Sequence, residues 1–302
     1  MNTKVTTSLG CAVAVLLSGV SSLVFAQMGE ETIQTAPNSD SPSQAQYEAA
    51  PPGGPADKIH GSVGLDFASH FVSYGGDVWG GGHDFYGSQS TKFAYIDLGA
   101  DLPNGFALTF GAWSDINNNA DEDTVGGNIQ EIDVYGGLTY TTGAVTLGAI
   151  YQQWYYGGDT ERVLDLSVGY DDSALWGGDF ALNPSFLTHI RVNGQEGQDD
   201  GAVFVGAIEP AFDLIDSPRT PVTLSIPASI GFMTDDFQGG DSGFGYASIG
   251  ATASMGLGFI PAGYGDWSVA FNTTYYHTDE DVIPGNPEDD FLTGTVSIGM
   301  AF

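Results

Sequence analysis

The feature that most constrains this chain is a series of alternating segments that starts near residue 59 and runs to the last residue. Within each segment, apolar or aromatic side chains alternate with small or polar ones, which is the period of a β-strand. Clusters of glycine, asparagine and aspartate separate the segments and favour turns. The pattern predicts twelve strands, at residues 61–74, 91–102, 106–116, 129–141, 144–156, 163–171, 183–193, 201–213, 220–232, 245–258, 265–277 and 291–302. Most have the length that a tilted strand needs to cross a bilayer.

The connections between these strands alternate in length. Long polar loops follow the first, third, ninth and eleventh strands, and shorter loops follow the fifth and seventh. Tight turns such as Pro103-Asn104-Gly105 and Thr142-Gly143 lie between them, together with links of moderate length at residues 172–182, 214–219 and 259–264. Long loops on one side and tight turns on the other are typical of barrels in bacterial outer membranes. The sequence therefore predicts an all-β, transmembrane, antiparallel up-and-down β-barrel of about twelve strands over residues 59–302.

The N-terminal part of the chain has a different character. Residues 1–26 combine Lys4, an apolar run and small residues at Val24-Phe25-Ala26, a pattern that predicts a signal peptide. The alternative, a retained membrane helix, would need a longer apolar run. Residues 27–58 are rich in proline, glycine, serine and glutamine, so we expect a flexible periplasmic tail, either a plain spacer or a docking segment. The only cysteine, Cys11, lies in the signal peptide, so the mature chain would form no disulfide.

The charge of the chain is strongly acidic. There are 6 lysines and arginines against 38 aspartates and glutamates, a net charge of -32. A hydrophobic share of 42% is too high for a disordered acidic protein. Nucleic acid is excluded as a partner, because its binding requires basic patches.

The last strand, residues 291–302, places Leu292, Val296, Ile298, Met300 and Phe302 on one face. It resembles the terminal strand of bacterial outer-membrane β-barrels, whose final residue is usually phenylalanine. Met300 stands where that strand often carries a second aromatic residue. The resemblance implies that Phe302 and Met300 form an assembly signal for the barrel-assembly machinery. It also implies location in the cell outer membrane, with its lipids and lipopolysaccharide as partners.

A second resemblance covers the middle of the chain. Leu182-Asn183-Pro184-Ser185, followed by residues 201–206, is similar to a group of uncharacterised bacterial outer-membrane proteins. Gly64-Leu65-Asp66-Phe67, with residues 70–75, is similar to the first strand of that group. This resemblance implies the barrel and its membrane, and no activity.

If the apolar face of each strand meets lipid, the other face lines the barrel interior. Periodicity alone does not tell the two apart, so this assignment rests on the leader, the strand length and Phe302. The residues that we expect to line the lumen are Asp66, His70, Asp97, Asp133, Asp165, His189, Arg191 and Glu209. Carboxylates with so few basic partners favour cations, which predicts a porin-like channel for passive diffusion of small solutes with a mild cation preference. Alternatively, these carboxylates, Arg191 and the tyrosines form a hydrogen-bonded plug, giving a non-conducting structural or adhesion barrel with acidic surface loops.

Other chemistry has weaker support in the sequence. Carboxylates cluster in the loops, for example at residues 121–123, 279–281 and 288–290, and could attract divalent cations. None of these clusters has EF-hand spacing, and solvated acidic loops are the simpler interpretation. The five histidines lie in no Gly-x-Ser-x-Gly or His-Glu-x-x-His motif, and the pairs His70–Ser73 and His83–Asp84 are weak candidates for catalysis. We therefore expect no enzyme activity, no cofactor and no dedicated metal site.

Overall fold

The computed structural model describes residues 59–119, 124–177, 180–194 and 200–302. The predicted signal peptide (residues 1–26), the predicted tail (27–58) and the acidic cluster at 121–123 lie outside the described residues. Within the described part, no helix is long and apolar enough to cross a membrane.

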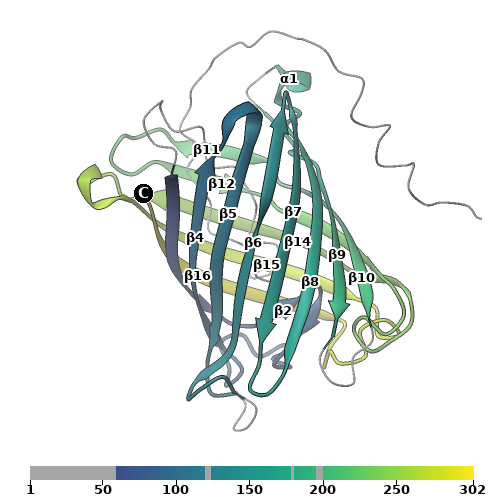
Figure 1. The fold of residues 1–302 in the computed structure, drawn as a ribbon. Coiled ribbons are helices and arrows are strands. Elements are labelled where there is room, and N and C mark those ends of the chain that lie inside the picture. The colour runs from purple at the N-terminus through teal and green to yellow at the C-terminus, as the bar shows by residue number, and fades with distance from the viewer. Residues whose placement is uncertain (1–58, 120–123, 178–179, 195–199) are drawn as a thin grey trace, which may run out of the picture. The chain divides into compact units, whose positions relative to one another are not determined.

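The described residues form one closed antiparallel barrel of twelve strands (Figure 1). Eight wall strands come first: β1 (Ile59–Ala68), β4 (Thr91–Asp101), β5 (Phe106–Ile116), β6 (Ile129–Thr142), β7 (Val145–Tyr155), β8 (Thr160–Tyr170), β9 (Ser185–Asn193) and β10 (Gly201–Ile208). The remaining elements of the wall are β11 (Ala211–Ile215), β12 (Val222–Ser225), β13 (Ala228–Met233), β14 (Gly243–Gly256), β15 (Asp266–Thr278) and β16 (Asp290–Ala301). Short elements in the connections are β2 (Val72–Ser73), β3 (Gly76–Asp77), α1 (Ser173–Trp176) and the 3-10 turns η2 (Pro103–Gly105) and η3 (Ala262–Tyr264).

Two neighbouring wall strands are interrupted by proline. Pro210 separates β10 from β11, and Pro227 separates β12 from β13. Proline has no N–H group for the ladder, so a strand breaks at such a position. Pairing continues on both sides, since β11 pairs with β12 and β10 with β13. Each interrupted pair therefore counts as one wall strand, which gives the predicted twelve.

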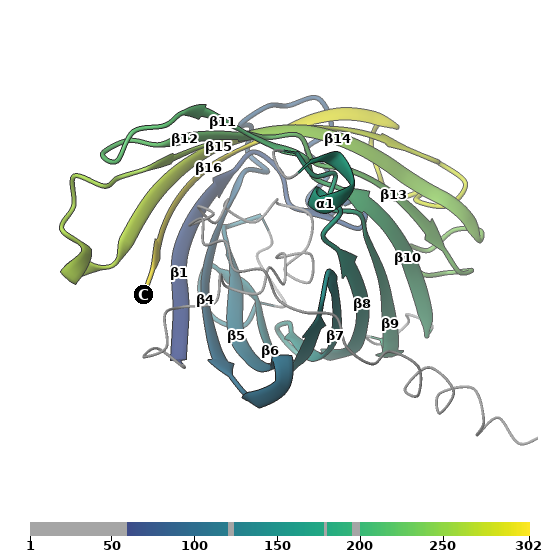
Figure 2. The ribbon, with the colours of Figure 1, turned by 90° about the horizontal axis from the view of Figure 1, so that it is seen from above.

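The barrel closes between its first and last strands. β1 pairs on one side with β4 and on the other with β16, for example Leu65 opposite Ile298. Gly61 and Phe302 exchange two backbone hydrogen bonds of 2.9 Å at the end of this seam. The view along the barrel shows β1 and β16 side by side (Figure 2). Closure pairs β1 on both sides, as a sheet in lipid requires, and among the described wall elements β11 alone pairs on one side only, with β12.

The connections alternate as predicted. The tight turns and α1 lie at the upper end in Figure 1, and the longer loops lie at the lower end. We call these the short-turn end and the long-loop end. One strand boundary was wrong, because β1 ends at Ala68 and not at residue 74. Residues 69–90, the first loop, leave the wall after Ser69, which still exchanges hydrogen bonds with Gly294 of β16: its N–H donates to the Gly294 carbonyl and its hydroxyl accepts from the Gly294 N–H, both at 2.8 Å.

The side-chain alternation follows the predicted faces. Outward positions are apolar and exposed, with Phe110 at 53%, Ile249 at 54% and Phe271 at 58% of full exposure. The alternate positions face the interior and are largely polar. On β14 to β16 these inward residues are small hydroxyl residues such as Thr252, Ser254, Thr274, Thr293 and Ser297, and all of them are buried.

Candidate functional site

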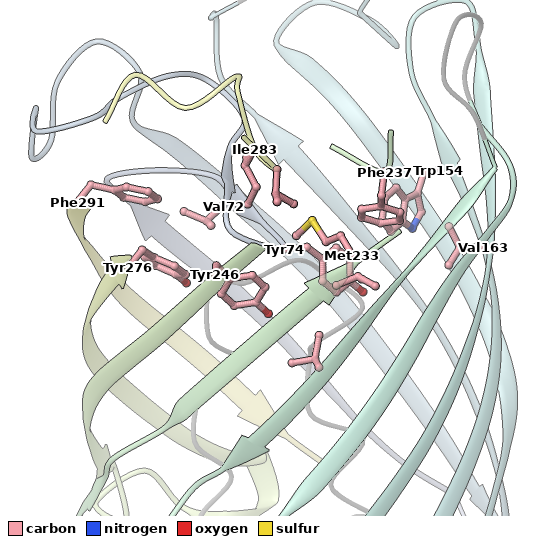
Figure 3. Packing of buried hydrophobic residues seen from close by; sticks show 13 residues of the cluster. Val72, Tyr74, Trp154, Val163, Met233, Phe237, Tyr246, Tyr276, Ile283 and Phe291 are labelled. Carbon is pink, nitrogen blue, oxygen red and sulfur yellow. The ribbon is translucent and has the colours of Figure 1, made fainter. Parts of the chain in front are cut away.

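The first loop enters the interior of the barrel at the long-loop end. Phe71 packs against Trp113 on β5, with ring centroids 5.3 Å apart. Tyr74 packs against His189 on β9, with ring centroids 4.4 Å apart. These two strands are separated by β6, β7 and β8 in the wall. A loop that reaches inward residues on both must lie across the interior, as Figure 3 shows for Val72 and Tyr74.

A tight hairpin forms the tip of this loop. Val72 pairs with Asp77, and Ser73 pairs with Gly76, so Tyr74 and Gly75 are the two turn residues. Both have positive φ, +48° and +80°, as a two-residue hairpin turn requires. A Cβ at Gly75 would lie 2.7 Å from the Cβ of Tyr246 on β14, so only glycine fits against this side of the wall. The turn therefore brings the hairpin tip into contact with a third part of the barrel.

Two other loops hold the hairpin in place. Asn286, in the connection between β15 and β16, donates to the carbonyl of Gly75 at 2.9 Å and accepts from the N–H of Asp77 at 2.7 Å. Gln238, in the connection between β13 and β14, donates to the carbonyl of Ser73 at 2.8 Å. The backbone polar groups of the inserted hairpin thus receive side-chain partners, as buried backbone needs.

A hydrogen-bonded chain joins the hairpin to the wall. The Tyr74 hydroxyl lies 2.7 Å from Nδ1 of His189, and the same nitrogen lies 2.7 Å from Oδ1 of Asp165. Gln152 donates to the other oxygen of Asp165 at 2.5 Å, and the Trp154 indole donates to Gln152 at 3.1 Å. The predicted residues His189 and Asp165 are therefore brought together, and both are buried.

Arg191, another of the predicted lumen residues, lies two residues beyond His189 on β9, toward the long-loop end. Its Nε donates to Glu161 at 2.8 Å, and its Nη1 donates to the Phe237 carbonyl at 2.9 Å. The guanidinium carbon also lies 4.3 Å from the centre of the Phe237 ring. This buried cation is paired and hydrogen-bonded, which offsets the cost of removing it from water.

The predicted carboxylates Asp66 and Asp97 lie on the neighbouring strands β1 and β4, opposite Phe93 and Ser62 respectively. The Tyr135 hydroxyl donates to Asp97, and Ser62 donates to the same carboxylate at 3.4 Å. Asp66 is buried. Gly111 makes room for the Tyr135 ring, because a Cβ there would collide with it.

The other predicted residues have different settings. Asp133 is fully buried on the inward face of β6. His70 lies in the first loop and not in the wall, with Nδ1 2.7 Å from the Ser69 hydroxyl and Nε2 3.1 Å from the Gly82 carbonyl. Glu209 lies at the break between β10 and β11, toward the short-turn end, and is half-buried.

Several inward residues were not among the predicted site residues. The aromatic ones include Tyr74, Phe93, Tyr95, Trp113, Tyr135, Trp154, Tyr246, Tyr276 and Phe291. The same alternation that selected the carboxylates places these wall residues inward, so the signal was present in the sequence. Tyr74 is different, because its position depends on the path of the first loop.

The size of the inward side chains changes along the barrel axis. Toward the short-turn end, inward positions carry small side chains, as in the row Thr109, Thr139, Thr146, Ser167 and Gly169. A Cβ at Gly169 would meet no atom within 4 Å. The large inward side chains and the first loop lie toward the long-loop end. The narrowest part of the interior is therefore expected beside the first loop.

The arrangement of the two faces decides the environment of this barrel. A soluble barrel would bury its apolar face, but here the apolar side chains are exposed and the charged ones are enclosed. The chain is a membrane-spanning β-barrel. Such barrels are of the bacterial outer-membrane type.

Known proteins resemble this chain in structure only. No protein-family model and no curated protein sequence matches the chain. Among solved structures, the NanC porin is similar at 8% identity, over 81% of this chain and 98% of that one, with a TM-score of 0.44. The KdgM porin is 10% identical over 80% and 99%, with a TM-score of 0.42. An outer-membrane channel from Pseudomonas putida F1 is 13% identical over 81% and 95%, with a TM-score of 0.41. At such identities and TM-scores, these proteins say nothing about the solutes of this chain.

Proposed function

We propose that this protein is an outer-membrane channel for passive diffusion of small solutes, with a mild preference for cations. The observation that carries the proposal is the charge of the inward face. Its carboxylates include Asp66, Asp97, Asp115, Glu131, Asp133, Glu161 and Asp165. Within the described strands, Arg191 is the only lysine or arginine on that face, and it is already paired with Glu161. An interior with this excess of negative charge attracts cations and repels anions.

The first loop would set the size limit of this channel. Its hairpin crosses the interior near the long-loop end, so a solute would pass between the hairpin and the wall. The small inward side chains toward the short-turn end would form a wider vestibule. We therefore expect small solutes to pass and large ones to be excluded.

Reconstitution of the purified protein in planar lipid bilayers tests the channel. We expect single-channel current steps in potassium chloride. Under a salt gradient, the reversal potential should have the sign of potassium selectivity, because the inward face is acidic. Chloride selectivity would contradict the proposal that the inward carboxylates set the selectivity. The absence of current at all applied voltages would contradict the channel itself.

A second candidate function is favoured by the packing of the first loop. The hydrogen-bonded chain from Tyr74 through His189 and Asp165 to Gln152 is the plug considered as the alternative above. A barrel closed in this way would be a structural or adhesion protein that presents acidic loops. The bilayer measurement separates the two functions, since only the channel conducts.

The remaining parts of the proposal concern partners. We propose that lipopolysaccharide and the barrel-assembly machinery are partners, and that the chain belongs near the group of uncharacterised outer-membrane proteins that it resembles. The acidic loops would attract divalent cations only diffusely, since the described residues contain no group of three histidines, cysteines or carboxylates that could hold a metal ion.

We also propose that the protein is not an enzyme. Both ring nitrogens of His70 already have partners within the first loop, so they are not free to act on a substrate.

A further inference from the structure

Asp133 lies between two tryptophans on the inner wall. In the sheet register it stands directly opposite Trp113 of β5 on one side and Trp154 of β7 on the other. Both tryptophans are almost completely buried, and Asp133 has no exposed surface. Glu131 lies two residues along β6, on the same face, and is also buried.

Asp133 differs from the inward carboxylates around it, because no amide, hydroxyl, indole or cationic group of the described residues donates to either of its oxygens, and the side chain that it meets is another carboxyl group, that of Glu131. The neighbouring carboxylates are each held by named donors: Asp97 by Tyr135, Asp115 by Trp79 and Asn117, Glu161 by Arg191, and Asp165 by Gln152. A buried carboxylate without a donor or a cation is strongly unfavourable. The site therefore calls for an occupant that supplies both charge and donors.

The surroundings restrict what that occupant can be. A divalent metal ion would need several oxygen ligands, and no group of three candidate ligands is arranged for one in the described part of the chain. An ammonium ion needs fewer ligands than a metal ion, because its N–H groups can donate to both oxygens of one carboxylate. Tryptophan rings are also the preferred aromatic neighbours of such cations.

We propose that Asp133, between Trp113 and Trp154, is a binding site for small primary ammonium ions within the channel. The enclosure of all three side chains limits the site to ions the size of ammonium or methylammonium. This inference rests on the proposed function and names the class of cation that the channel would favour. The competing occupant is a single proton shared between Asp133 and Glu131, which would leave no site for an amine.

The test compares methylammonium with potassium and with tetramethylammonium, which carries the same charge but has no N–H donor. Wild-type protein and the variants Asp133→Asn and Asp97→Asn are reconstituted in planar bilayers in potassium chloride, and each ion is added in turn. Tryptophan fluorescence of the detergent-solubilised proteins is titrated with the same ions. Asp97→Asn is the matched control, because it removes an inward carboxylate that already has donors.

We expect methylammonium to reduce the potassium current of the wild type at low concentration and tetramethylammonium to have little effect. Asp133→Asn should raise the half-blocking concentration of methylammonium about tenfold, the effect of losing one charge-assisted contact, whereas Asp97→Asn should leave it nearly unchanged. Equal responses to methylammonium and potassium in the wild type, or equal half-blocking concentrations in the wild type and Asp133→Asn, would overturn the site.

The two proposals fail in different ways. A wild-type protein that gives no current contradicts the channel, and the fluorescence titration then decides the ammonium site alone. If Asp133→Asn does not fold, equal responses of the wild type to methylammonium and potassium would still overturn the ammonium site. A current with no discrimination between the ions leaves the channel and removes the site.

Discussion

At the scale of single residues, Asp172 shows how one side chain can organise a connection at the short-turn end. It lies just before α1, where one carboxylate oxygen accepts from the Trp176 indole at 2.6 Å. The other oxygen accepts from the N–H groups of Leu182 and Asn183, at 2.8 and 2.9 Å. Burial alone would raise the pKa of Asp172, but the hydrogen bonds from Trp176 and the two N–H groups together hold the pKa below its usual value.

This lowered pKa leads to a prediction about acid. A carboxyl whose pKa is lower in the folded state stabilises the fold above its unfolded pKa, near 4, and loses that contribution as the pH falls through the folded pKa. We expect the amides of Leu182 and Asn183 to lose protection from hydrogen exchange below about pH 4. Asp172→Asn should abolish this acid dependence, whereas Asp171→Asn should keep it. Identical pH profiles for the wild type and Asp172→Asn would contradict the role of the carboxylate.

At the scale of elements, the first loop is the part that separates a wide barrel from a constricted one. It is held by side chains from β9, from the β13–β14 connection and from the β15–β16 connection. Tyr74 is held at φ +48°, where non-glycine residues are uncommon, and the surrounding contacts keep it there. The hairpin is therefore an ordered element with partners on several sides.

Replacing residues 72–77 by a short glycine-serine linker should increase the single-channel conductance. The reason is that the replacement removes Val72 and Tyr74 from the interior and leaves the wall strands unchanged. Gly158→Ser, in the connection between β7 and β8, is the control and should leave the conductance as it was, because a Cβ at this position would meet no atom within 4 Å. A conductance that does not change when the hairpin is removed would mean that the hairpin does not limit the passage.

At the scale of the whole molecule, closure of the barrel depends on the pairing of the last strand with the first. β16 pairs with both β15 and β1, and Phe302 continues the seam through its two hydrogen bonds with Gly61. The Phe302 side chain is exposed on the apolar outer face. The interpretation of Phe302 and Met300 as an assembly signal stays a prediction.

We expect Phe302→Ala to lower the amount of folded barrel in the membrane, because the terminal aromatic is the feature that resembles an assembly signal. Heat-modifiable migration on gels, which separates folded from unfolded barrels, measures the yield. Phe271→Ala is the matched control, since it removes a similarly exposed aromatic from the neighbouring strand β15. Equal yields for the two variants would argue against a special role for the terminal residue.

Much of this architecture could be read from local patterns. Alternation with period two and turn residues such as Asn104 and Gly105 are properties of neighbouring residues, so they predicted the twelve strands, their faces and the alternation of connections. The same alternation placed Asp66, Asp97, Asp133, Asp165, His189 and Arg191 at inward positions. The end of β1 was missed, because no local pattern records the contacts that Phe71 and Tyr74 make with Trp113 and His189 across the interior.

The state of the interior depends instead on contacts between distant parts of the chain. The contact of Tyr74 with His189 joins residues 115 positions apart, and Asn286 reaches Gly75 across 211 positions. No local pattern records which carboxylates acquire donors, so Asp165 and Asp133 look alike in the sequence. Only the folded barrel shows that Asp165 receives donors from Gln152 and that Asp133 meets only another carboxyl group, because hydrogen bonding in a closed barrel is set by what lies opposite in space.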